Sequence, residues 1–228
     1  MPRGSADASA LRDLLLVPGI LRGLEAREPP ARIPTGVDAL DALLGGGLPR
    51  GALTEIVGRP SAGRTTLACT LLRAVTAHHD LAACIDPRDT LDASHAESAG
   101  VDLARVLWVR PRMARDALRA ALHVLEADGF GLVVVDLDGA GTPPAAPASV
   151  WMRLTRAALR TRTAVVVLGR ENVAGTFAAL RLEVERRRVV FDGPPSRALL
   201  GAVTSAIHLR KSKLGAPASR PALTVARS

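Results

Sequence analysis

The sequence has few aromatic residues, no tyrosine, and only two lysines and two cysteines among its 228 residues. Aromatics make up 2%, which argues against single-strand binding by base stacking, because that needs several exposed rings. Cys69 and Cys84 lack metal-ligand spacing and any disulfide framework, so we expect both in the core. No apolar run approaches the roughly 20 residues that cross a bilayer. Leu14–Val17 is also too short for a signal-peptide core, so we expect a cytoplasmic protein without membrane contact.

The excess positive charge is concentrated near the C-terminus. Thirty Lys and Arg against 22 Asp and Glu give a net charge of +8. Residues 1–185 hold 21 bases and 21 acids, so the rest of the chain carries the whole excess. A segregated basic region indicates contact with nucleic acid or an acidic partner; the alternative is a solvated surface with a basic tail. Arg186, Arg187 and Arg188 are the best phosphate-contact candidates by charge, unless they guard an exposed edge strand.

Apolar strands alternate with amphipathic helices from Ile33 onward. Continuous Val/Leu runs predict strands that are covered on both faces, and β/α alternation predicts a parallel sheet flanked by helices. These strands are Leu53–Val57, Leu81–Ile85, Val106–Val109, Leu132–Val135 and Ala164–Leu168. Later strands follow one another without helices and are expected to be antiparallel at one sheet edge: Arg181–Glu185, Val189–Phe191, Ala202–Leu209 and Leu223–Val225. The sequence thus predicts an α/β core over 33–214, after an N-terminal helix and linker (1–32) and before a basic Pro/Ala-rich tail (215–228).

The strand Leu53–Val57 runs directly into a glycine-rich loop that precedes a helix. Backbone N–H groups of such a loop, at a helix N-terminus, cradle a phosphate group. In this motif a threonine hydroxyl and a strand-end aspartate hold Mg²⁺. The candidate nucleotide-binding residues are Gly58, Gly63, Arg64, Thr65, Thr66 and Asp136.

The loop departs from the motif at one position. The motif requires a lysine where this chain has Arg64. A guanidinium is bulkier than an ammonium group and has a rigid fork, so the exchange is not conservative. Arg64 either fills the phosphate pocket itself or points outward. We expect Asp138, two residues beyond Asp136, to be a solvated turn residue.

These segments together resemble the core of RecA-type recombinases, between Ile33 and Val225. The resemblance implies a RecA-like P-loop NTPase core, and it also shows departures. Arg88 stands where recombinases carry the glutamate that activates water, and Gly169-Arg170 replaces the glutamine that senses the γ-phosphate. Both DNA-binding loops are shortened, and we expect no recombinase-type C-terminal domain. The matching segments are Ile33–Gly36, Gly46–Gly51, Gly63–Leu67, Cys84–Asp86, Leu91–Asp92, Ala99–Asp102, Leu132–Asp136, Arg181–Val184 and Leu209–Pro217.

A RecA-like core with a degenerate ATPase site resembles the ImuA family, the RecA-related accessory factors of SOS mutagenesis. This resemblance implies a non-hydrolytic adaptor in translesion synthesis that docks on RecA, on an ImuB-like Y-family polymerase homologue and on a DnaE-type polymerase. It implies no catalytic residue, no required cofactor and at most weak binding of ATP and Mg²⁺. DNA is a further candidate partner. Two alternatives stay open: an active DNA-dependent ATPase, and a basic DNA-binding module.

The two lysines fall at positions that carry a role in recombinases. There, a Lys-x-Lys pair reaches the ATP of the neighbouring subunit across the filament interface, and Lys211 and Lys213 match that pair. The resemblance therefore implies that they contact the nucleotide bound to a RecA protomer. The alternative is that Arg210, Lys211 and Lys213 form the exposed end of a strand or contact DNA phosphates.

Overall fold

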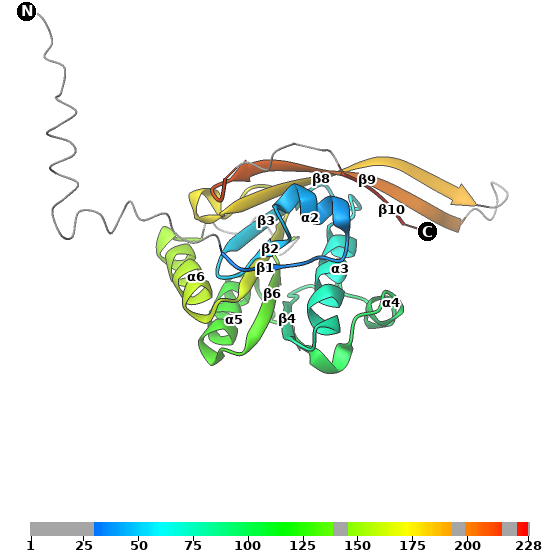
Figure 1. The fold of residues 1–228 in the computed structure, drawn as a ribbon. Coiled ribbons are helices and arrows are strands. Elements are labelled where there is room, and N and C mark those ends of the chain that lie inside the picture. Colours follow the sequence, from blue (N-terminus) through cyan, green and yellow to red (C-terminus); the bar gives the residue numbers. More distant parts are fainter. Residues whose placement is uncertain (1–29, 139–145, 193–198, 216–222, 228) are drawn as a thin grey trace, which may run out of the picture.

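An eight-stranded sheet with helices on both faces organises the computed structural model (Figure 1). The model describes residues 30–138, 146–192, 199–215 and 223–227. The strand order is β10-β9-β8-β3-β7-β6-β4-β5, and a separate pair, β1 and β2, lies beside it. All neighbours from β8 to β5 are parallel, whereas β8, β9 and β10 are antiparallel. The predicted α/β fold, with antiparallel strands at the C-terminal edge, is confirmed.

The elements follow the predicted order, with boundaries that differ by a few residues. The strands are β1 (Arg32–Ile33), β2 (Leu48–Pro49), β3 (Leu53–Gly58), β4 (Leu81–Ile85), β5 (Val106–Val109), β6 (Phe130–Asp136), β7 (Ala164–Gly169), β8 (Leu180–Asp192), β9 (Leu199–Ser212) and β10 (Leu223–Arg227). The helices are α2 (Asp38–Leu44), α3 (Arg64–Ala77), α4 (Ala93–Ser98), α5 (Ala114–Ala127) and α6 (Ala148–Thr161), with short 3-10 turns η2 (Leu103–Arg105) and η3 (Gly175–Phe177).

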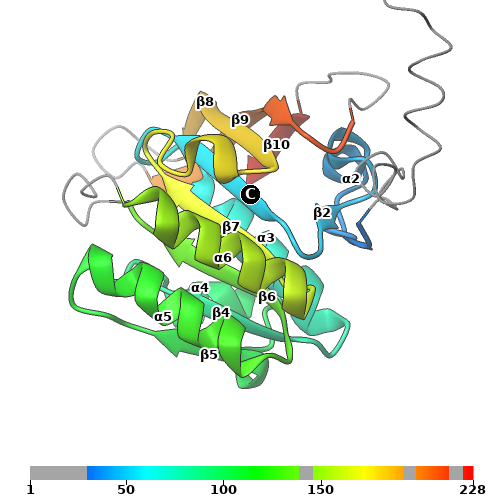
Figure 2. The same ribbon diagram turned by 90° about the vertical axis from the view of Figure 1, so that its left-hand side faces the viewer.

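Two hydrophobic cores lie on the two faces of the sheet. The first packs α2, α3 and α4 against one face, and the second packs α5 and α6 against the other. Figure 2 shows α5 and α6 side by side on the second face. The central strand β7 is buried at every residue, as expected for a strand covered on both sides. Cys69 and Cys84 are buried in the first core, as predicted.

Thr35 lies before helix α2 and does not cap it, although a threonine near the start of a helix often acts as a cap. The helix starts at Asp38, and its N-cap residue, Val37, makes no side-chain capping bond. The Thr35 hydroxyl instead accepts a hydrogen bond from the Val37 N–H (3.3 Å), and the Thr35 N–H donates to Asp41 Oδ1 (2.8 Å). These bonds order the turn before the helix, and the sequence could not distinguish this use of Thr35 from capping.

Three of the four strands predicted at the C-terminal edge form one long hairpin, and the fourth, Leu223–Val225, is present as β10. Strand β8 continues without a break through Arg186–Arg188, and β9 pairs with it along its length. The register shifts between Arg186 and Arg188, so the three arginines occupy a bulge, not a turn. Part of the hairpin projects beyond the body of the molecule (Figure 1), and the three arginines of β8 are exposed. The alternation that marks a half-buried strand is therefore absent there.

The predicted segment limits stay predictions. Most of the N-terminal segment 1–32 lies outside the described residues. Strand β10 pairs with β9 inside the segment 215–228 that the sequence assigns to the tail. None of the helices in the described ranges is both long and apolar enough to cross a membrane.

Candidate functional site

The glycine-rich loop joins the end of β3 to the first turn of α3. Gly63 precedes the helix with φ of 101°, a left-handed conformation that favours glycine. At Gly58 a Cβ atom would lie 2.4 Å from the Val184 carbonyl oxygen, so a side chain there would collide with the backbone of β8. The Thr65 and Thr66 side chains line a pocket beside the loop. The local fold of a phosphate loop is therefore present.

The side chain of Arg64, the first residue of α3, is buried and pairs with an aspartate. Its side chain is only 6% exposed and forms an ion pair with Asp138. Asp138 also accepts a hydrogen bond from Arg170 Nε (2.6 Å), so one carboxylate bridges two guanidinium groups. The buried Arg64 Nη1 has no hydrogen-bond partner in the described parts of the chain. Arg64 therefore does not point outward into solvent, and it lines the pocket described below. Asp138 lies in a turn, as expected, but it is half-buried and paired with two arginines, so the expectation that it is solvated is wrong.

The charge on Asp138 is already neutralised by these contacts. Burial alone would raise the pKa of Asp138, but hydrogen bonds and charge from Arg170 and Arg64 outweigh it and hold the pKa below its ordinary value. A carboxylate with a lowered pKa is a weak general base. Asp138 is also the single carboxylate among the described residues that line the pocket. Among the described residues, the pocket therefore offers no unpaired carboxylate.

Asp136 ends strand β6, as predicted, at the same edge of the sheet as the loop. Its Oδ1 accepts a hydrogen bond from the Asp138 N–H (2.8 Å), and its Oδ2 lies 3.2 Å from the Thr90 hydroxyl. Burial raises the pKa of Asp136, and nearby Asp86 adds to this, although both hydrogen bonds act in the other direction. Asp136 therefore sits where a magnesium ligand would be expected, in a setting that disfavours its charge.

Replacing Asp136 tests how much its buried charge lowers the stability of the fold. The folded chain disfavours ionised Asp136, so its charge destabilises the fold at neutral pH, and that cost disappears as the pH falls through the raised pKa. Asp136→Asn is expected to raise the Tm by a few degrees at pH 7, measured without nucleotide and with EDTA. The gain should shrink as the pH is lowered. Exposed Glu97→Gln should cause no such change, and a pH-independent gain for Asp136→Asn would contradict the assignment.

A pocket of about 310 Å³ opens beside the loop, between α2 and the β8–β9 hairpin. Its walls combine apolar side chains with hydroxyl groups, and the Ser205 hydroxyl donates to the Ala62 carbonyl (2.7 Å) to fix the loop. Arg64 is one of the residues that line the pocket. Among the described residues, the loop cation is paired with Asp138, and no carboxylate other than Asp138 lines the pocket, a set that does not match a site for hydrolysis of Mg·ATP. The lining residues are Val37, Leu40, Pro60, Ser61, Gly63, Arg64, Thr65, Thr66, Leu67, Thr70, Asp138, Val184, Val203, Ser205 and Ile207.

The two lysines lie together with a third cation at the base of the hairpin. Lys211 Nζ donates to the Gly175 carbonyl (2.8 Å), and Lys213 Nζ donates to the Thr176 carbonyl. Arg181 Nη2 reaches the same Gly175 oxygen (3.3 Å). Burial lowers the pKa of Lys211, and the charges of Lys213 and Arg181 lower it further. A cluster of mutually repelling cations of this kind is suited to an anion.

Sequence reasoning missed Glu55, a fully buried carboxylate in β3. Its oxygens accept hydrogen bonds from the Val173 N–H (2.6 Å) and the Ala174 N–H (2.9 Å), and Arg181 Nε lies 2.8 Å away. Glu55 thereby fixes the segment that leads into η3, whose carbonyls hold the two lysines. A signal existed: an acidic residue inside an otherwise buried strand requires a partner.

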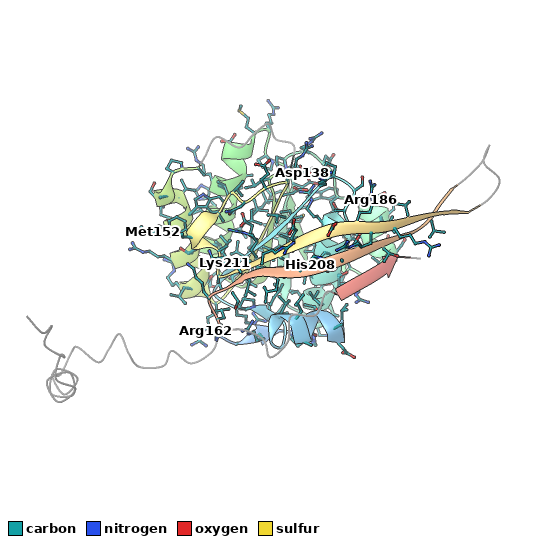
Figure 3. The ribbon with its side chains drawn as sticks, turned by 90° about the horizontal axis from the view of Figure 1, so that it is seen from above. Asp138, Met152, Arg162, Arg186, His208 and Lys211 are labelled. Atoms are coloured by element: carbon teal, nitrogen blue, oxygen red, sulfur yellow. The ribbon has the colours of Figure 1, made fainter. Side chains whose placement is uncertain are left out.

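The remaining basic candidates lie on strands β8 and β9. Arg187 is engaged by Glu185 (2.9 Å), and Arg210 by Glu183 (2.5 Å). Arg186 and Arg188 are exposed, and no ion pair of theirs is found within the described parts of the chain. Figure 3 shows Lys211, His208 and Arg186 in this order along the hairpin, with Arg186 toward the projecting end. Of the three predicted arginines, Arg186 and Arg188 are therefore without an ion pair among the described residues.

Comparison with known proteins agrees with this geometry. A family profile described as the RecA N-terminal domain matches residues 20–168. Among similar proteins, "Protein RecA" of Nocardia farcinica is 34% identical over 182 residues, which is 76% of this chain and 51% of the relative. The Cutibacterium acnes protein of the same name is 36% identical over 174 residues, 72% of this chain and 49% of the relative. The chain thus spans about half the length of these curated relatives. With this sequence match and a sheet of the expected topology, the chain belongs to the RecA N-terminal domain family.

Proposed function

We propose that this protein is a non-hydrolytic RecA-like adaptor in damage-induced translesion mutagenesis. The observation that carries the proposal is the Arg64–Asp138 ion pair inside an otherwise complete phosphate loop. The loop keeps its shape while its cation is bound by the protein's own carboxylate. Such a domain retains the surfaces of a RecA core but does not hydrolyse ATP. No cofactor is required for this role, and ATP with Mg²⁺ binds at most weakly.

The alternative of an active DNA-dependent ATPase is less well supported. Hydrolysis needs a base that activates water, and losing such a base typically costs about 10²–10⁴-fold in rate. Exposed Arg88 occupies the position aligned with the recombinase glutamate, and a cation cannot serve as that base. The pocket lining offers Asp138 alone, which is engaged by two arginines. Turnover that disappears in Asp136→Ala would support the enzyme instead.

The lysine cluster supports docking on RecA. Lys211 and Lys213 are held by the carbonyls of Gly175 and Thr176, so their ammonium groups are positioned before any partner arrives. Preorganised cations lose little conformational freedom on binding an anion. We propose that the anion is the nucleotide on a neighbouring RecA protomer. The surface would then contact one RecA subunit without itself extending a filament.

The proposal that error-prone polymerases are partners rests on the resemblance to the ImuA family. We propose that an ImuB-like polymerase homologue and a DnaE-type polymerase bind surfaces other than the lysine cluster. DNA contact is a secondary role for Arg186 and Arg188, which are exposed on the projecting hairpin. Phosphate contacts of this kind are sensitive to salt, so RecA docking should be measured with and without DNA.

Loss of the two lysines is the direct test. Lys211→Ala/Lys213→Ala is expected to weaken binding to purified RecA with ATP by about tenfold, because two positioned cations are lost. The measurement is a pull-down titrated with RecA and quantified. Arg186→Ala/Arg188→Ala, which removes the same charge at the projecting end of the hairpin, serves as the matched control. Undiminished RecA binding by the lysine variant would overturn the docking proposal.

A further inference from the structure

The outer face of α6 carries a basic ridge that the overall charge balance conceals. Between Asp138 and Glu171 the sequence holds five arginines and no acidic residue. Four of them, Arg153, Arg156, Arg160 and Arg162, lie on α6 or at its C-terminal end, and all four are exposed. We call these four residues, together with Met152 and Leu159, the α6 face.

Most of these cations have no ion-pair partner among the described residues. Arg153 lies 3.8 Å from Glu126 of α5, a long and exposed pair of little energetic value. No ion pair of Arg156, Arg160 or Arg162 is found among the described residues. Arg160 and Arg162 are placed to offset the negative end of the helix dipole. That explanation does not reach Arg153 and Arg156, which lie before the last turn.

Two exposed apolar side chains lie along the same face. Met152 is 41% exposed and Leu159 is 53% exposed. Met152, Arg156 and Leu159 are spaced by four and three residues, so they form one row along the helix. Leu159 lies beside Gly51, which has no side chain to cover it; a Cβ there would be 3.6 Å from Leu159 Cδ1. The apolar row is therefore open to a partner.

A second row, which shares Arg156 with the first, is entirely basic. Arg153, Arg156 and Arg160 are also spaced by three and four residues and lie on the side of α5, since Arg153 meets Glu126. The α6 face is thus divided lengthwise into an apolar row and a basic row, with Arg156 common to both. The opposite side of the helix, with Trp151 and Leu154, is buried in the core.

We propose that the α6 face binds an acidic amphipathic helix of a partner protein. Carboxylates on one side of such a helix meet the basic row, and its apolar side chains cover Met152 and Leu159. A nucleic-acid backbone would satisfy the arginines alone and leave the apolar row exposed, which favours a protein partner. Methionine adapts to differently shaped apolar neighbours.

The α6 face is separate from the surfaces already described. Figure 3 places Met152 and Arg162 on the side of the molecule away from Arg186. An adaptor needs a second docking surface, so this proposal deepens the proposed function and rests on it for the biological context. Peptide binding itself requires neither RecA nor a nucleotide, so failure here and failure of the lysine test are distinguishable.

The test uses the full chain and a labelled synthetic peptide of about five helical turns, with Leu on one face and Glu on the other. Fluorescence anisotropy measures its Kd. Arg156→Glu/Arg160→Glu is expected to weaken binding about tenfold, and Met152→Ser/Leu159→Ser about fivefold. Arg186→Glu/Arg188→Glu, a charge reversal on the opposite side, should leave the Kd unchanged. Arg156→Lys/Arg160→Lys should retain most of the affinity, which separates charge from loss of folding.

Two further controls have results that could overturn the proposal. A peptide of the same composition with its Leu residues scattered should bind about fivefold more weakly, because it cannot present one apolar face. If that peptide binds equally well, or if Met152→Ser/Leu159→Ser has no effect on the Kd, the α6 face attracts the peptide by charge alone. Either result would overturn the proposal. A duplex oligonucleotide that displaces the peptide, and that loses affinity equally in Arg156→Glu/Arg160→Glu, would assign the face to nucleic acid instead.

Discussion

Asp138→Ala is expected to increase the affinity for ATP by about 10- to 100-fold without producing hydrolysis. The substitution removes the carboxylate that pairs with Arg64 and Arg170, and so returns an unpaired guanidinium to the phosphate loop. Hydrogen bonds to charged groups contribute roughly 1.5–3 kcal/mol, and about 1.4 kcal/mol corresponds to tenfold in Kd. The loop also loses a negative charge that opposes the phosphates.

A titration with a fluorescent ATP analogue and Mg²⁺ measures the gain, and a phosphate-release assay with DNA measures turnover. Arg170→Ala is the matched control, since it leaves the Arg64–Asp138 pair in place and should not improve binding. Asp80→Ala breaks a comparable pair with Arg50 near the other end of α3 and should also change nothing. Unchanged affinity in Asp138→Ala would show that the ion pair does not close the loop. Hydrolysis in any of these proteins would favour the ATPase alternative.

The parallel core was predictable from the sequence because its signal is local. Each buried strand, such as Ala164–Gly169, is a short unbroken apolar run between helical patterns, and the loop after β3 has a fixed spacing of glycines. The hairpin was not predictable as a continuous unit. Arg186, Arg187 and Arg188 are all exposed, so the sequence indicated a break between two strands where a single strand continues.

The contacts within the site depend on the tertiary fold. Arg64 and Asp138 are 74 residues apart and meet because β3 and β6 end at the same edge of the sheet. The sequence predicted that Asp136 lies at this edge. The same reasoning, applied to Asp138 after β6 and to Arg170 after β7, would have placed both of them near Arg64. The α6 face was hidden for a different reason: averaging charge over residues 1–185 gives zero, although one helix within that range is strongly basic.

The largest loss of stability is expected from Arg181→Met. The substitution keeps an unbranched apolar side chain but removes the cation beside Glu55, which is fully buried. Removing one partner from a buried ion pair typically costs about 3–5 kcal/mol, because the other charge remains without compensation. Urea denaturation of the full chain measures the loss. Arg110→Met, which breaks a pair with Asp89 that is more than half exposed, should cost less than about 1 kcal/mol.

A double variant separates the buried charge from the lost packing. Glu55→Gln/Arg181→Met leaves no unpaired carboxylate, and the glutamine carbonyl still accepts a hydrogen bond from the backbone N–H of Val173 or Ala174. It should therefore be more stable than Arg181→Met alone, a non-additivity expected for groups in contact. Arg181→Met should also weaken RecA docking, since Glu55 fixes the segment whose Gly175 carbonyl holds Lys211. Additive losses would mean that the ion pair contributes through packing alone, and the lysine cluster would then have to be positioned by the hairpin without help from Glu55.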